Sequence, residues 1–289
     1  MVVAYSFLFL RIIFLAVERI TVKKLGDFEG NMEKNIAATF LFFFIGALSL
    51  APFVAVQTID NYEFVIPVLI NGIVYSFYAS LYVFSLAKGE ASLVTPITSL
   101  GSLVLLILSV IFLGESLNIG KIAGILIIIF GLSYLKRSDS FSTSMKLLFK
   151  EKAVLLMFVA VTIQSFGRIL DKFFIVNMNP VAYVFFLYLM ISFYLLLFLI
   201  YKRKVSAIYE LFIRKPGWAI ASGLINGYSY YFLMMTLKEI ELSVAEPLSQ
   251  TSMVITVILS SLFLKEKIRD KLAGSIIILL GGWLLFLDI

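Results

Sequence analysis

Two charged side chains lie within long apolar stretches of this 289-residue sequence, where an ionisable group can bind a solute or carry a proton. Glu246 directly precedes Pro247 in the stretch ELSVAEPLSQTS, residues 241–252, and Arg11 lies near the middle of the first apolar run. A charged side chain at the centre of a membrane costs at least about 2.5 kcal/mol and usually has a function. We expect Glu246 to be a protonatable group or a partner for a cationic group, and Arg11 to bind an anionic group such as a carboxylate.

Each of these residues also has a structural interpretation. Glu246 lies five residues after Glu241 and can instead sit at the membrane surface, in contact with water. Arg11 can instead form an ion pair with Glu246 or with Glu18, which lies seven residues further along on the same helical face. The sequence alone leaves these alternatives open.

A stripe of polar side chains runs along the third apolar stretch. Asn71, Tyr75, Tyr78 and Tyr82 are spaced by four, three and four residues, which places them on one face of a helix. Buried amides and phenols need hydrogen-bond partners, so the stripe favours the lining of a wet cavity. Hydrogen bonding between helices, or an aromatic belt at the membrane surface, is an equally good interpretation.

Two later stretches carry similar pairs. Asn226 and Tyr230 lie four residues apart in the eighth stretch, and Gln164 and Arg168 lie four apart in the sixth. Gln164 and Arg168 belong to the same candidate lining, although Arg168 is closer to a helix end, where extension of the side chain to the membrane surface is the commoner explanation. The candidate solute-binding residues are Arg11, Asn71, Tyr75, Tyr78, Thr95, Gln164, Asn226, Tyr230, Glu246 and Gln250.

Two prolines are candidate helix breaks. The residue before a proline disfavours the helical region, and proline suits the first position of a helix. Thr95-Pro96 and Glu246-Pro247 therefore predict that a helix restarts at each site, after bent or unwound segments at 91–94 and 242–245. Threonine is a natural cap at such a position, whereas glutamate is a poor one.

The composition indicates an integral membrane protein without a soluble domain. Hydrophobic residues make up 61% of the chain, and the mean hydropathy is +1.03, far above what a soluble core needs. The net charge of +6 is better explained by membrane topology than by a nucleic-acid partner. We expect the first apolar run to be a retained helix and not a cleaved signal peptide.

The composition also excludes several kinds of chemistry. The chain has no cysteine and no histidine, which excludes disulfides, thiolate catalysis, histidine bases and the usual zinc or haem ligands. It has neither a phosphate-binding loop nor a G-x-G-x-x-G turn, and no Ser-Lys or paired-Asp arrangement for intramembrane catalysis. We predict no catalytic residue, no metal site and no cofactor, and therefore a protein that is not an enzyme.

A helix needs about 20 apolar residues to cross a bilayer, and the apolar stretches separated by charges predict ten spans. Their limits are 2–22, 36–57, 64–87, 91–113, 119–135, 153–175, 180–201, 216–236, 242–264 and 271–288.

The two halves of the sequence repeat. Glu90, Pro96 and Glu115 are matched by Glu241, Pro247 and Glu266, each 151 residues later, and Arg19 and Lys23 by Arg168 and Lys172, 149 residues later. Ala123-Gly124 and Gly131 are matched by Ala273-Gly274 and Gly281. These small residues predict close packing of neighbouring helices. Because five spans per half is an odd number, the second half is expected to be inverted, a common plan of secondary transporters. Glu115 and Glu266 are interpreted as loop caps or ion-pair partners.

The sequence resembles the drug/metabolite transporter superfamily in its ten-helix, EamA-type form. The resemblance rests on ASLVTPITSLGSLVLLILSVIFLGESLNIGKIAGILIIIFGL and LSVAEPLSQTSMVITVILSSLFLKEKIRDKLAGSIIILLGG, and it covers nearly the whole chain. It implies an all-α integral membrane fold of two inverted five-helix repeats, 1–137 and 153–289, joined by a basic connecting loop at 138–152. It also implies a central cavity lined by the first, third, fourth, sixth, eighth and ninth helices, with the fifth and tenth at the periphery.

The function implied is a permease that moves a small organic metabolite, such as an amino acid, by alternating access. The expected partners are this solute, a coupling proton and the lipid bilayer of the plasma membrane, with the protein a monomer or a homodimer. A flippase for a lipid-linked sugar is the nearest alternative, and a non-transporting membrane protein is a weaker one. These expectations fix neither the solute nor the direction of transport.

Two arguments about membrane orientation disagree. Lysine and arginine fall mainly in the odd-numbered connections, so the positive-inside rule predicts that both termini lie outside, whereas the family resemblance implies that both are cytoplasmic. The charge bias runs through five connections and is given more weight here. These basic segments are 23–34, Lys88, 136–152, 202–215 and 265–271.

Overall fold

The protein is a bundle of helices in a computed structural model that describes residues 2–26, 31–56, 64–113, 118–175, 179–240 and 242–285, and within these ranges there is no strand. The helices of the first half are α1 (Val2–Leu25), α2 (Met32–Ala55), α3 (Val65–Lys88), α4 (Ala91–Val94), the 3₁₀ helix η1 (Thr95–Ser99), α5 (Leu100–Leu113), α6 (Ile119–Leu135) and α7 (Phe141–Lys150). The helices of the second half are α8 (Lys152–Ile175), α9 (Pro180–Tyr201), α10 (Ser206–Arg214), α11 (Pro216–Glu239), α12 (Leu242–Ser249), α13 (Thr251–Leu264) and α14 (Arg269–Leu284).

Each predicted span coincides with one of these helices or with a consecutive set of them. Among the described residues, five segments are long and apolar enough to cross a membrane by length and composition: Met32–Ala55, Val65–Lys88, Ala91–Leu108, Lys152–Phe173 and Pro180–Tyr201. Two shorter apolar helices, Ile119–Leu135 and Thr251–Leu264, lie beside them. The protein is therefore a multi-pass, all-helical membrane protein, while the count of ten crossings remains a prediction.

Two short helices lie where the sequence analysis expected only connections. α7 lies within the segment 138–152 that was predicted to be a basic loop, and α10 lies between the seventh and eighth predicted spans. Ser140 caps α7 by accepting a hydrogen bond from the backbone N–H of Thr143. Each helix buries one leucine, Leu148 in α7 and Leu211 in α10. The exposed positions of both helices include apolar as well as polar residues. Their helical periodicity was overlooked because both are too short to be a span.

The predicted helix restart is found at Thr95-Pro96, where η1 begins, but not at Glu246-Pro247, and the segments before the two prolines are not unwound. Residues 91–94 are helical, and Thr95 itself has φ −59° and ψ −44°, within the helical region. The chain tightens into η1 from Thr95 onward, so the break is a change of helix type and not an unwound segment. In the second half α12 continues through Glu246 and Pro247, and the interruption follows at Gln250. The Thr95 side chain does not cap: its hydroxyl is buried without a hydrogen-bond partner among the described residues.

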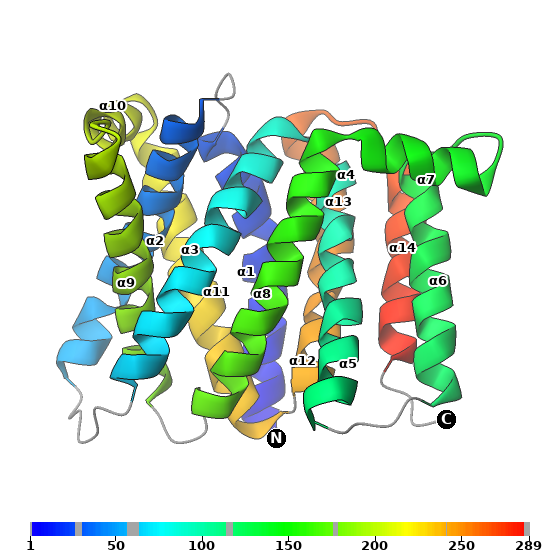
Figure 1. The fold of residues 1–289 in the computed structure, drawn as a ribbon, viewed down its shortest axis with the longest axis horizontal. Coiled ribbons are helices and arrows are strands. Elements are labelled where there is room, and N and C mark those ends of the chain that lie inside the picture. The colour runs from blue at the N-terminus through cyan, green and yellow to red at the C-terminus, as the bar shows by residue number, and fades with distance from the viewer. Residues whose placement is uncertain are drawn as a thin grey trace.

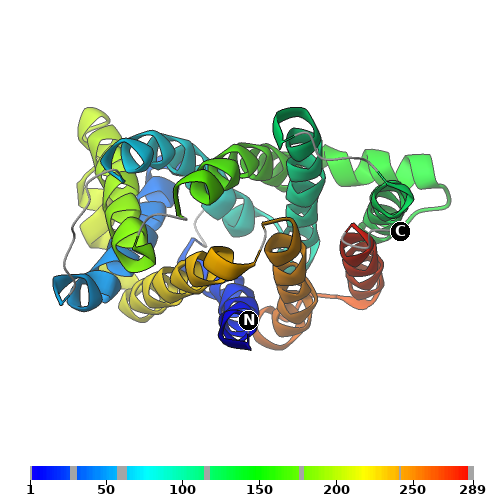
Figure 2. The ribbon, with the colours of Figure 1, turned by 90° about the horizontal axis from the view of Figure 1, so that it is seen from below.

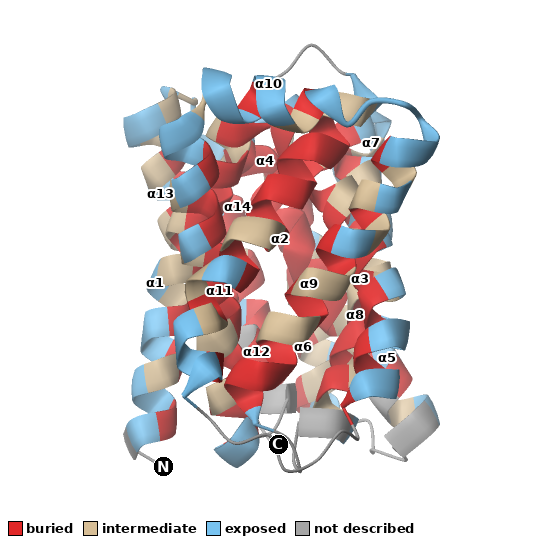
Figure 3. Ribbon diagram, turned by 90° about the vertical axis from the view of Figure 1, so that its left-hand side faces the viewer, coloured by how far each residue is buried: buried red, intermediate tan, exposed pale blue. Residues whose placement is uncertain are grey.

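The helices are arranged so that segments from both halves interleave. The start of α1 and the end of α14 lie at one end of the bundle, and the short helices α7 and α10 lie at the other (Figure 1). α1 packs mainly against α11, and α3 packs mainly against α8, so the first helix of each half contacts the third helix of the other. Buried residues follow the interior of the bundle and exposed ones its outer surface (Figure 3).

α6 and α14 form a pair at one end of the long axis, seen from below in Figure 2. Their close packing depends on the predicted glycines. A Cβ on Gly124 would lie 2.7 Å from the carbonyl oxygen of Gly281, and one on Gly274 would lie 2.9 Å from that of Gly131. A side chain at these positions would push the two backbones apart, so the sequence-based prediction of glycine-mediated packing is confirmed.

Candidate functional site

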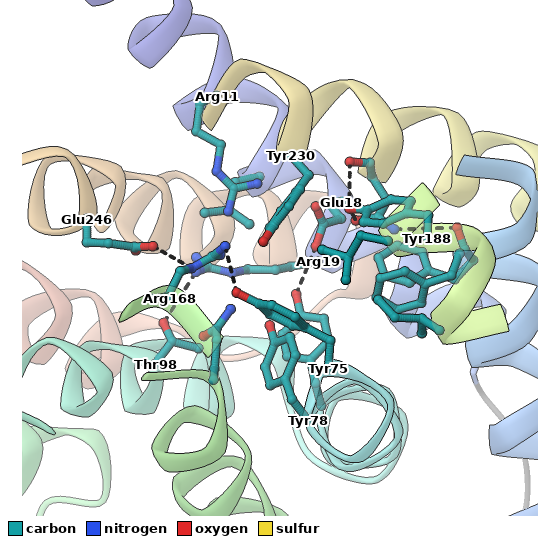
Figure 4. Close-up of a pocket in the computed structure, with 18 of the residues that line it drawn as sticks. Arg11, Glu18, Arg19, Tyr75, Tyr78, Thr98, Arg168, Tyr188, Tyr230 and Glu246 are labelled. Carbon is teal, nitrogen blue, oxygen red and sulfur yellow. Dashed lines mark hydrogen bonds and ion pairs between the residues drawn. The ribbon is translucent and has the colours of Figure 1, made fainter. Parts of the chain in front are cut away.

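A cavity lies between the two halves. Its walls come from α1, α2, α3 and η1 of the first half and from α8, α9, α11 and α12 of the second (Figure 4). The six helices named by the family resemblance all contribute, and the second and seventh predicted spans, α2 and α9, contribute as well. The lining residues are Arg11, Leu15, Glu18, Arg19, Phe42, Phe43, Tyr75, Tyr78, Tyr82, Thr98, Gln164, Arg168, Leu187, Tyr188, Ile191, Asn226, Tyr230, Glu246 and Gln250.

Most of the candidate residues share this cavity. Arg11, Tyr75, Tyr78, Gln164, Asn226, Tyr230, Glu246 and Gln250 all line it. Asn71 and Thr95 do not: both are fully buried, and the Asn71 side chain is engaged between helices. Pro96 is buried within η1, whereas the side chain of Pro247 lies outside the described residues.

Arg168 lies between two carboxylates on one wall of the cavity. Its Nε is 2.6 Å from Oε1 of Glu246, and its Nη1 is 3.4 Å from Oδ2 of Asp171. The guanidinium also faces the ring of Tyr230, 4.9 Å from its centroid, a favourable cation–π geometry. Arg168 therefore lies in the cavity lining, as its spacing from Gln164 predicts, and does not extend to the outer surface, because the residue is only 3% exposed. Glu246 is also buried and lines the cavity.

Asp171 lies behind this wall and accepts hydrogen bonds from several side chains around it. Its Oδ1 accepts hydrogen bonds from Asn71 Nδ2 at 2.7 Å and from the Tyr183 hydroxyl at 2.7 Å. Its Oδ2 accepts from the Tyr75 hydroxyl at 2.6 Å and from the Tyr230 hydroxyl. A buried carboxylate with this many donors is well compensated. The hub ties α8 to α3, α9 and α11 and fixes the positions of two cavity tyrosines.

The wall formed by α1 carries charged side chains that interact at longer range without forming an ion pair. Arg19 donates to the hydroxyls of Ser252 at 3.1 Å and Thr98 at 3.3 Å, and Arg11 donates to the Ser229 hydroxyl. Glu18 accepts from the Tyr82 hydroxyl at 3.3 Å. Among the described residues none of these three side chains forms an ion pair, and the Nε atoms of both arginines are buried without a hydrogen-bond partner. The predicted alternative, an ion pair of Arg11 with Glu18 or Glu246, is therefore not formed.

The aromatic lining is held by hydrogen bonds between the halves. Tyr188 donates to Oδ1 of Asn226 at 2.7 Å, and its ring packs edge-on against Phe43 with centroids 4.7 Å apart. Tyr75 and Tyr230 also meet edge-on, with centroids 6.0 Å apart. Tyr75, Tyr78 and Tyr82 line the cavity, and hydrogen bonds between helices are made by Asn71, Tyr75 and Tyr82. The two interpretations of the polar stripe therefore apply together.

Glu266 caps a helix of the other half. Its carboxylate accepts hydrogen bonds from the backbone N–H groups of Ala91 at 2.9 Å and Ser92 at 2.8 Å, and from the Ser92 hydroxyl at 2.6 Å. Lys271 forms an ion pair with Glu90 beside it. The prediction of a cap is confirmed for Glu266, although the capped residues are not in its own loop. Glu115 and Glu241 lie outside the described residues.

Several site residues were missed from the sequence. Asp171 was not singled out because one acid next to a lysine near a helix end resembles an exposed charge. Arg19 served only as a marker of the repeat, and Thr98 and Tyr188 were not considered. The repeat itself held a usable signal for Arg19, since its counterpart is Arg168, four residues after Gln164.

Comparisons with known proteins agree with this architecture. The EamA-like transporter family matches residues 2–136 and 151–287. A crystal structure of another protein superposes on 98% of this chain and 95% of that chain with a TM-score of 0.63 and 17% sequence identity, a likeness of fold alone. An uncharacterized protein of Methanocaldococcus jannaschii is 39% identical over 59 residues, which span 20% of this chain and 43% of that protein. Because the family matches both halves over nearly their whole length, the chain belongs to the EamA-like transporter family.

Proposed function

We propose that this protein is a secondary active transporter that moves a small organic solute, such as an amino acid, across the plasma membrane. The observation that carries the proposal is the cavity between the two halves, which is lined by three arginines and two glutamates within an apolar bundle. Buried charges of this kind are costly in a membrane and typically mark a solute or ion pathway. Family membership supports transport in general and leaves the solute to be found.

The mechanism we propose is alternating access by rocking of the two halves. The ten predicted spans all cross the membrane in this proposal, and α1 and α8 hold equivalent places in halves of opposite orientation. The cavity lies where such repeats meet, the usual place of a transporter site. The basic end with α7 and α10 faces the cytoplasm by the positive-inside rule. Impermeant-reagent labelling of single cysteines introduced at Arg137 and Arg203 tests this orientation.

Glu246 is the proposed coupling group. The Glu246 carboxylate forms an ion pair with Arg168, and a proton on Glu246 would weaken this pair and free Arg168 toward Asp171. The Glu246→Gln variant, which mimics the protonated state, should therefore lose stimulation of uptake by a proton gradient while keeping solute exchange. Undiminished stimulation in this variant would assign coupling to another group.

The test of the function itself is transport by the purified protein in liposomes. Amino acids, organic acids, nucleosides and sugars are tested for uptake, and a fluorescent lipid-linked sugar analogue is tested for movement between leaflets. We expect uptake of a soluble solute that protein-free liposomes do not show. Movement of the lipid without any soluble uptake would favour the flippase alternative instead.

A further inference from the structure

Arg19 and Arg168 hold equivalent places in the two halves of the structure. One turn after each arginine, a lysine caps the end of the third helix of its own half. Lys23 Nζ donates to the carbonyl oxygen of Gly89 at 2.7 Å, and Lys172 Nζ lies 3.0 Å from that of Leu237 and 3.5 Å from that of Ile240. Gly89 and Ile240 are themselves 151 residues apart in the repeat. The helices that carry the two arginines are therefore placed alike, and so are the arginines.

The two arginines differ in the charge of the residue that the repeat places beside them. Arg168 forms its ion pair with Glu246, the residue before the proline of the second half. The counterpart of Glu246 in the first half is Thr95, which carries no charge. Arg19 accordingly contacts only the hydroxyls of Thr98 and Ser252 and has no carboxylate within ion-pair distance among the described residues.

The surroundings of Arg19 have the features of an unfilled anion site. Arg19 is only 3% exposed, and its Nε is buried without a hydrogen-bond partner. The Nε of Arg168 forms no hydrogen bond either, but it lies 2.6 Å from the Glu246 carboxylate, whereas that of Arg19 has no such anion in the described part of the chain. Thr95 has a fully buried hydroxyl that is also unpartnered among the described residues. Thr98 links the two, since its hydroxyl accepts from Arg19 at 3.3 Å and lies 2.7 Å from the carbonyl oxygen of Thr95. Buried polar groups normally have partners, and a buried guanidinium most favours a carboxylate.

We infer that the solute carries a carboxylate and that this group binds at Arg19, in the place equivalent to that of the Glu246 carboxylate at Arg168. The inference rests on the proposal that the cavity is the solute site, and it adds which chemical group the solute must have and where that group lies. Arg11 lies eight residues from Arg19 on the same wall and is the second cation of this subsite. The Glu18 carboxylate, also in the lining, interacts with both arginines, so this group of three side chains keeps one net positive charge for the solute. Arg168 is not part of it, because Asp171 and Glu246 already compensate its charge.

The first test supplies the missing carboxylate from the protein itself and needs no known solute. Thr95→Glu restores the residue of the second half, and Thr95→Gln is its neutral control of the same size. We expect the Glu variant to unfold at a higher temperature than the Gln variant in detergent, and this difference to vanish in the Arg19→Gln background. A Glu variant no more stable than the Gln variant, or a difference that persists without Arg19, overturns the inference.

The second test compares acids with their amides. Amino acids and simple monocarboxylates are each measured beside the matching carboxamide by stabilisation of the detergent-purified protein, since a ligand that binds the native state raises its stability. Loss of a charge-assisted contact with a buried guanidinium predicts binding at least about tenfold weaker for the amide. Thr95→Glu should bind the acids at least about tenfold more weakly than Thr95→Gln, because its own carboxylate occupies the subsite.

The outcomes separate this inference from the proposed function. Equal stabilisation by acids and amides overturns the carboxylate site even when uptake into liposomes is observed. Carboxylate binding that depends on Arg19, together with no uptake of any bound solute, supports the site and contradicts transport. Arg19→Gln with the exposed Arg214→Gln as control decides the question if both Thr95 variants fail to fold: a selective loss of carboxylate binding in the first supports the site, and equal binding by the two overturns it.

Discussion

Two buried arginines at equivalent places in the halves of this protein have opposite surroundings. Arg168 is compensated by Glu246 and Asp171, and the tyrosines around it are fixed by hydrogen bonds. Arg19 has only hydroxyl contacts, and Arg11 and Glu18 on the same helix form no ion pair among the described residues. Because the two halves repeat, the contacts of a residue in the second half can be compared with those of its counterpart in the first. The difference between them indicates which interactions the protein completes by itself and which it leaves to a ligand.

The largest predicted effect is the difference in stability lost when each arginine is replaced in turn. Arg168→Gln leaves two buried carboxylates without their cation, and removing one partner of a buried ion pair typically costs about 3–5 kcal/mol. Arg19→Gln leaves Ser252 and Thr98, which keep backbone acceptors at 2.6 and 2.7 Å, so we expect a cost below about 1 kcal/mol. Unfolding midpoints of the two variants in detergent measure the difference. Equal destabilisation would contradict the comparison.

A similar effect is expected at the acid that supports Arg168. Asp171→Asn removes the charge that accepts hydrogen bonds from three tyrosines and Asn71, and we expect a loss of roughly 3 kcal/mol, at the lower end for a broken buried pair because Glu246 still faces Arg168. The control is Asp270→Asn, an exposed acid in the first turn of α14, for which about 0.3–1 kcal/mol is expected. A loss of stability in Asp171→Asn no larger than that of the control would contradict the role of Asp171 as a charged partner of Arg168.

The smallest predicted difference compares two tyrosines on α9. Both side chains are buried, and each donates a hydrogen bond of 2.7 Å, Tyr183 to the Asp171 carboxylate and Tyr188 to the Asn226 amide oxygen. Hydrogen bonds to charged groups contribute about 1.5–3 kcal/mol and neutral ones about 0.5–1.5. Tyr183→Phe should therefore lower the free energy of unfolding more than Tyr188→Phe in denaturant titrations. The reverse order would indicate that Asp171 is not the dominant acceptor.

The sequence predicted the fold well because the repeat and the apolar runs are long signals. The matched positions Glu90 and Glu241 fixed the equivalence of the halves, and the glycines of α6 and α14 indicated where helices approach. Prediction failed where a few interactions outweigh local preference. Thr95 stays helical before a proline because η1 is packed against α8, α13 and α14, and a tertiary environment overrides a local bias of this size.

The site was predicted in part for a different reason. Residue type and spacing identify polar faces such as Tyr75 and Tyr78, because the helical period is contained in the chain. The sequence does not show which side chains meet across the bundle. The ion pair of Arg168 with Glu246 joins α8 to α12, and Asp171 gathers donors from three other helices, which requires the helix arrangement to be known first.

The central claim is that solute passes through the cavity between the halves, and the absence of native cysteine allows a direct measurement. Gln164 lines the cavity and is partly exposed to it, so a Gln164→Cys variant in liposomes is treated with a charged methanethiosulfonate reagent, and uptake of a solute that the parent transports is followed. We predict that modification abolishes uptake, that bound solute slows the modification, and that the cysteine-free parent is unaffected. Full modification of Gln164→Cys with undiminished uptake would contradict a route through this cavity.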